Sequence, residues 1–183
     1  MILSKWDGFM DTYDHINEYI NNRVNDGEAR ELVSDFAILW NQYERTVFKG
    51  EHHIGGIRKK IEQHDYITEM PQINVLYDRF EKYLESRNIK FEYEDIKRAY
   101  SIRIKNDNPV RRGDLYKDEL EKAINNKNSF AKTYLLMIIA AKIRNNMFHG
   151  TKGPWELKEN KELFKICNEL LMCILEATHS KDL

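Results

Sequence analysis

Apolar side chains recur at three- and four-residue intervals along most of this chain, and that period is typical of amphipathic α-helices. Residues 28–48 show it clearly, because one face carries Leu32, Phe36, Leu39, Tyr43 and Val47, with Trp40 widening it on one side. The same pattern predicts further helices over residues 7–23, 71–88, 92–103, 114–126, 130–148 and from 160 to near the C-terminus. Residues 57–64 fit either a short helix or an irregular connection.

Residues at the predicted helix ends agree with these boundaries. Pro71 suits a first helical turn, Asp114 and Asn160 suit N-caps, and Gly150 suits a stop. Residues 100–104, Tyr-Ser-Ile-Arg-Ile, also alternate as in a strand, although the longer pattern around Ile96 favours a helix.

The helix predicted over residues 130–148 is apolar on nearly every side between Tyr134 and Ala141. A helix of that kind must lie in the interior of the protein, with other helices around it. The chain is therefore predicted to be all-α. We expect an antiparallel helical bundle of about four core helices with additional inserted short helices, forming a single domain over residues 1–183.

Composition restricts the partners and the compartment of the protein. The formal net charge is −1, which excludes a broad electropositive surface, so any RNA contact must be local. Two short basic patches can supply such a contact, one with Arg58, Lys59 and Lys60 and one with Arg111 and Arg112, although both also fit solvated surface charge.

The longest apolar run is too short to cross a bilayer and the first residues lack a signal-peptide layout, so we expect a cytoplasmic protein. Cys167 and Cys173 are expected to be reduced thiols in or near the core.

The central helix ends in an unusual polar cluster, Arg144-Asn-Asn-Met-Phe-His149-Gly150. Helix capping is one explanation, because basic and amide side chains stabilise the last carbonyl groups. An active site is the other. A histidine can exchange a proton with a ribose 2′-hydroxyl or a leaving oxygen, while an arginine neutralises charge on the phosphate, and no metal is needed.

Helical geometry places Asn145 and His149 on one face, since they are four residues apart. Arg144 is rotated from His149 by about 140°, at about 100° per residue. A long arginine side chain, or a second copy of the chain, must bridge that angle.

An arginine followed a few residues later by a histidine occurs three times, at Arg45–His52, Arg58–His64 and Arg144–His149. Only the third pair has an amide residue directly after the arginine, a strongly apolar helix before it and a glycine directly after the histidine. This context, rather than the spacing, singles out residues 144–150.

With this motif at the end of a late helix, the chain resembles the HEPN superfamily. Residues 35–48, which carry a tryptophan and a glutamate, are similar to a long helix seen in several of these domains. The resemblance implies a metal-independent endoribonuclease without cofactor, usually a homodimer that sets two such motifs face to face. It also implies a setting in toxin–antitoxin, abortive-infection or antiviral defence systems, with an antitoxin or another defence protein as a possible partner.

Carried over residue by residue, the resemblance makes Arg144 and His149 the catalytic pair and Asn145 the polar residue that orients them. Glu44 and Asn146 are the candidates for supporting positions behind that pair.

Two other functions fit the sequence. The first is a non-catalytic HEPN-like helical module that binds RNA, a nucleotide or a partner protein, which the nearly neutral net charge favours. The second is a metal-dependent hydrolase built on His52 and His53, although adjacent histidines without further ligands make an incomplete metal site.

Overall fold

The computed structural model describes residues 26–48, 56–102, 104, 115–148 and 159–180. In these ranges the chain is α-helical, which confirms the predicted all-α class, and Ile104 and Leu115 form an isolated β-bridge. The elements are α2 (Gly27–Tyr43), η1 (Glu44–Phe48), α3 (Ile57–Gln63), η3 (Asp65–Ile67), α4 (Gln72–Ser86), α5 (Tyr93–Ala99), α6 (Lys117–Asn125), α7 (Ser129–Phe148) and α9 (Lys161–His179). The helix predicted over residues 7–23 lies outside the described residues.

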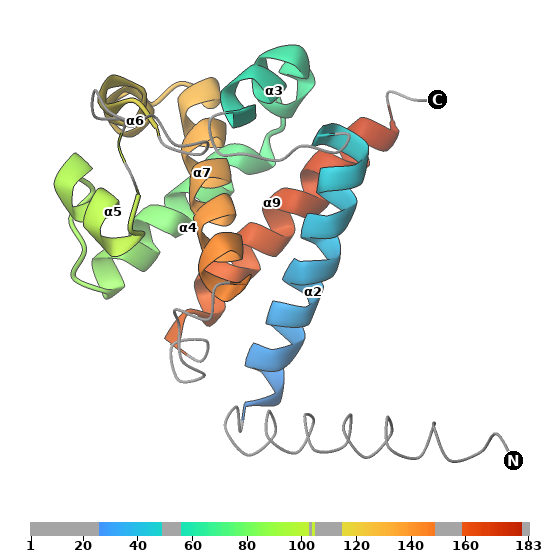
Figure 1. Ribbon diagram of the computed structural model, residues 1–183, viewed down its shortest axis with the longest axis horizontal. Helices are drawn as coiled ribbons and strands as arrows, with labels where there is room; N and C mark the ends of the chain where they lie inside the picture. The colour runs from blue at the N-terminus through green and yellow to red at the C-terminus, as the bar shows by residue number, and fades with distance from the viewer. Residues whose placement is uncertain (1–25, 49–55, 103, 105–114, 149–158, 181–183) are drawn as a thin grey trace, which may run out of the picture.

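Helix α9 connects the two sides of the bundle, because α2 and α4 both pack along it (Figure 1). Helices α2 and α9 run in the same direction, since Lys161 at the start of α9 pairs with Asp26 and Glu28 at the start of α2. Helix α4 runs the opposite way, so Arg87, just after its C-terminal end, meets Glu159 just before α9.

Helix α7 occupies the centre of the fold, as its sequence predicts. Each residue from Leu135 to Ala141 is at most 2% exposed, and the helix packs against α3, α4, α6 and α9. Burial of this continuous apolar surface is the main contribution that favours the folded state.

Several predicted boundaries need correction. Helix α5 ends at Ala99 rather than at Arg103, because Ser101 adopts a left-handed backbone with φ of 50° and Ile102 N–H donates to the Lys97 carbonyl at 2.9 Å. Helix α6 begins at Lys117 rather than near Asp114, which is outside the described residues, and the Tyr116 N–H donates to the Glu119 carboxylate at 3.4 Å.

The start of α9 is where we predicted it, but Asn160 does not cap it with its side chain. The Asn160 side-chain oxygen instead accepts a hydrogen bond from the Tyr83 hydroxyl, so this residue ties α9 to α4. Along α9, Cys167 is buried, Cys173 is half-buried, and both are free thiols, as predicted.

Within the described residues, no helix is both long enough and apolar enough to span a membrane.

Candidate active site

The apolar character of α7 ends at Ala141, and the last turns of the helix are polar. Ala141 is fully buried and Ile143 is 8% exposed, whereas Arg144, Asn145 and Asn146 are all partly exposed. The buried part of α7 therefore holds these three side chains on a rigid base at the edge of the core.

The structure brings Arg144 together with two of the residues that the sequence placed around it. One terminal guanidinium nitrogen of Arg144 lies 3.4 Å from a carboxylate oxygen of Glu44, and the other donates to Asn145 Oδ1 at 3.3 Å. The Arg144 side chain is 32% exposed and that of Glu44 is 26% exposed. His149, the proposed acid–base residue, lies outside the described residues.

Glu44 occupies a particular place in the backbone. Helix α2 ends as an α-helix at Tyr43, and Glu44 begins the π-helical turn η1. π-helical turns are rare, and those inserted in α-helices are found frequently at functional sites.

Aromatic packing anchors this turn. The Tyr43 ring lies 5.4 Å from the Trp40 ring and 5.6 Å from the Phe48 ring, measured between centroids, and all three side chains are buried. Burial, and to a smaller extent the charge of Glu44, raises the pKa of the Tyr43 phenol far above its usual value, so Tyr43 remains neutral.

The ion pair between Glu44 and Arg144 orients these groups more than it stabilises the fold. Partly exposed pairs of this kind contribute at most about 1 kcal/mol to stability, because water screens the attraction. A guanidinium carries five N–H donors in a planar fork, a geometry that suits the recognition of a phosphate.

The other residues predicted to contact RNA or metal are placed as follows. Arg58 lies 3.0 Å from Glu62 and 3.6 Å from Glu119, so carboxylates offset its charge. Lys59 is exposed, and the Lys60 ammonium lies 5.8 Å from the centre of the Phe48 ring. Arg111, Arg112, His52 and His53 all fall outside the described residues. Within the described ranges, no group of three or more His, Cys, Asp or Glu residues is arranged to hold a metal ion.

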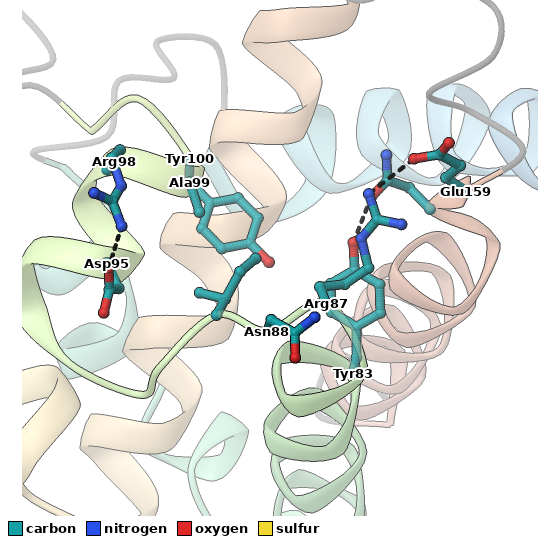
Figure 2. A pocket seen from close by; sticks show the side chains of 10 residues that line it. Tyr83, Arg87, Asn88, Asp95, Arg98, Ala99, Tyr100 and Glu159 are labelled. Carbon is teal, nitrogen blue, oxygen red and sulfur yellow. Dashed lines mark hydrogen bonds and ion pairs between the residues drawn. The ribbon is translucent and has the colours of Figure 1, made fainter.

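Sequence reasoning missed a polar pocket of about 460 Å³ where α4, α5 and the start of α9 meet (Figure 2). Arg87 and Tyr100 are among its lining residues. Its lining residues come from the continuous stretch 83–100 and from the distant residues 159–160, and neither segment has a motif of its own. Helix periodicity marks Tyr100 as a core residue, so the sequence gives no signal for this site.

No protein-family model matches the chain, no curated protein matches it, and no solved structure matches it. The resemblance to the HEPN superfamily therefore depends on residues 144–150 and on the similarity of residues 35–48 to a long helix of those domains.

Proposed function

We propose that this protein is a metal-independent endoribonuclease of the HEPN type. The observation that supports the proposal best is the arrangement at the end of α7, where Arg144 is held half-buried between Glu44 and Asn145. Arg144 is five residues before His149, the residue that would move the proton. A fixed guanidinium beside a histidine matches the needs of phosphodiester cleavage.

In the proposed reaction, neutral His149 accepts the proton of a ribose 2′-hydroxyl. The 2′-oxygen forms a bond to phosphorus, and the bond from phosphorus to the 5′-oxygen breaks. That oxygen takes a proton from the protonated imidazole of His149, in the same or the facing copy, and leaves as a 5′-hydroxyl, while the other fragment keeps a 2′,3′-cyclic phosphate. Arg144 stabilises the negative charge that builds up on the phosphate oxygens, and Asn145 and Glu44 orient Arg144.

A homodimer is part of this proposal. Arg144 and His149 would be separated by about 140° around a regular helix, an angle that the long arginine side chain or a second copy of the chain must bridge. We propose the second route. A second copy with its own motif, facing the first, would supply the missing group. A role in a toxin–antitoxin, abortive-infection or antiviral system, controlled by a partner protein, follows from the same resemblance.

The ion pair with Glu44 also favours one alternative. A carboxylate within 3.4 Å offsets the charge of Arg144, which suits a non-catalytic module that binds RNA or a partner protein. Binding of RNA without cleavage, at every protein concentration tested, would identify that module.

The purified protein is expected to cleave single-stranded RNA in a buffer that contains EDTA, because His149 and Arg144 supply all the chemistry. Gel electrophoresis would follow cleavage, and mass spectrometry would identify a 2′,3′-cyclic phosphate end. A matched RNA with a 2′-deoxy sugar at the cleaved position should resist, because it lacks the nucleophile. Strict dependence on an added divalent metal would contradict the proposal.

Glu44→Gln is expected to lower kcat about tenfold and to leave KM within about twofold, since the amide holds Arg144 less firmly and the energetic difference is about 1.4 kcal/mol. Unfolding stability should change by less than about 1 kcal/mol, as for other partly exposed ion pairs. Single-turnover cleavage rates and thermal unfolding are the two measurements.

The matched control is Glu31→Gln, an exposed glutamate on the same helix α2. We expect it to change neither kcat nor stability. Equal activity of Glu44→Gln and the wild-type protein would remove Glu44 from the proposed site.

A further inference from the structure

The polar pocket between α4, α5 and α9 lies at the ends of two helices. Helix α4 is closed by Asn88, with φ of 54°, and α5 is closed by Ser101, with φ of 50°. The amides of Ile89 and Ile102 then donate to carbonyls in the preceding helical turns, both at 2.9 Å. These left-handed closures stop both helices at the pocket, whose volume of about 460 Å³ falls within the range of roughly 300–1,000 Å³ typical of ligand sites.

The walls of the pocket carry balanced charge. Arg87 pairs with Glu159 at 2.8 Å, and Arg98 pairs with Asp95 (Figure 2). The Arg87 side chain is 38% exposed and that of Glu159 is 53% exposed. Because exposed pairs of this kind are weak, a ligand phosphate can take the place of the carboxylate, and it gains charge-assisted hydrogen bonds from the guanidinium.

The Tyr100 hydroxyl is the feature that points to a ligand. Tyr100 is 5% exposed, and its buried hydroxyl has no hydrogen-bond partner among the described residues. Figure 2 shows this hydroxyl directed into the pocket, toward the side where Arg87 and Asn88 lie. A buried polar group without a partner costs about 1–3 kcal/mol, so an occupant that pairs with it would be stabilised there.

Tyr83, which also lines the pocket, provides the contrast. Its hydroxyl donates to Asn160, so it is already satisfied. Burial raises the pKa of Tyr100 far above its usual value, and the nearby charge of Arg87 opposes this only weakly. Tyr100 therefore stays protonated and can donate a hydrogen bond to an oxygen or nitrogen of a ligand.

We propose that this pocket binds a ribonucleotide, with Arg87 on the phosphate and with Tyr100 and the Asn88 amide on the sugar or base. Several features favour a nucleotide over a bare anion. The two guanidiniums are balanced by two carboxylates, which disfavours a highly charged ligand, and the hydroxyl and amide groups match the neutral polar groups of a nucleoside.

The bound nucleotide can be free or part of an RNA strand, and both present the same chemistry to the pocket. Glu159 lies ten residues after His149 in the sequence. Only the strand-bound form rests on the proposed endoribonuclease function.

Isothermal titration with each of the four ribonucleoside 5′-monophosphates tests the proposal. The protein is used as His149→Ala, so that a failure of the cleavage proposal does not affect the result. At least one nucleotide should bind, and Arg87→Gln should weaken that binding by about tenfold to a hundredfold, since charged hydrogen bonds have this strength. Tyr100→Phe, which keeps the ring, should weaken it by several fold. Inorganic phosphate, as a separate titrant, should bind much more weakly.

Arg79→Gln is the matched control, because Arg79 lies on the same helix α4 and pairs with Glu162 and Glu169 of α9 but does not line the pocket. It should leave nucleotide affinity unchanged. If Arg79→Gln lowered nucleotide affinity as much as Arg87→Gln does, the placement of the nucleotide in this pocket would be overturned. Binding of inorganic phosphate as tight as that of the best nucleotide would also overturn it.

A short RNA with 2′-O-methyl sugars distinguishes the two sources of the ligand. Tighter binding of this oligomer than of the mononucleotide, weakened by Arg87→Gln, identifies a nucleotide within a strand. Equal or weaker binding of the oligomer identifies the free nucleotide. The absence of binding by all four monophosphates and by the oligomer would overturn the proposal, whatever the outcome of the cleavage assay.

Discussion

Replacement of His149 by alanine is expected to lower the rate of RNA cleavage by about 10²–10⁴-fold, which is the usual contribution of a general acid or base. The imidazole is the group in the motif that titrates near neutral pH, and the neighbouring asparagines cannot replace it. The measurement is the single-turnover rate on an RNA of defined sequence, with circular dichroism to show that the variant is folded.

Arg144→Ala belongs to the same experiment, because arginine and histidine act on the same transition state. We expect it to lower the rate by about 10²–10³-fold, the effect of removing one preorganised donor to a developing negative charge. The double variant should be little slower than the slower single variant, since groups that act as a unit lose their effect together. If the wild-type protein is toxic when expressed in bacteria, Arg144→Ala should relieve that toxicity.

Two controls make this result decisive. His179→Ala changes an exposed histidine near the end of α9, and Arg30→Ala changes an exposed arginine on α2. Both should cleave RNA at the wild-type rate. Undiminished cleavage by His149→Ala would show that the activity comes from another site or from a contaminating nuclease.

Apolar periodicity in the sequence predicted which segments form the packed helices, but it predicted poorly where those helices end. Core positions such as Phe36, Phe80 and Leu170 are all at most 1% exposed, because one large effect, the burial of apolar surface, decides their places. Helix ends depend on weaker local interactions that compete with one another. The left-handed backbone at Ser101 shortened α5, and the contact between Tyr83 and Asn160 removed the expected side-chain cap from α9.

The candidate site, too, could be predicted from the sequence only in part. The motif around Arg144 is contiguous, so it can be read directly from the sequence, and the resemblance to the HEPN superfamily implies a supporting position for Glu44. The ion pair between them joins residues one hundred positions apart, and Glu44 lies in a π-helical turn that the apolar pattern does not indicate. The pocket around Tyr100 is formed by the packing of the start of α9 against α4 and α5, and therefore no sequence motif predicts it.

Trp40→Ala is expected to destabilise the protein by about 3–5 kcal/mol, the usual cost of removing a large buried aromatic side chain. Trp40 is 2% exposed, and its ring lies 5.9 Å from that of Phe36, which in turn packs at 5.7 Å on Phe164 of α9. The cavity would therefore open in the contact that holds α2 against α9. Urea unfolding at 25 °C measures the loss.

The matched control for this change is Ile38→Ala, two residues earlier on α2, where the side chain is 60% exposed. It should alter stability by no more than about 0.5 kcal/mol, because little apolar surface is buried there. Since Trp40 also packs on Tyr43, directly before Glu44, folded Trp40→Ala protein should lose cleavage activity as well, whereas Ile38→Ala should keep it. Equal destabilisation by both substitutions would contradict the placement of Trp40 in the core and, with it, the aromatic anchor that positions Glu44 beside Arg144.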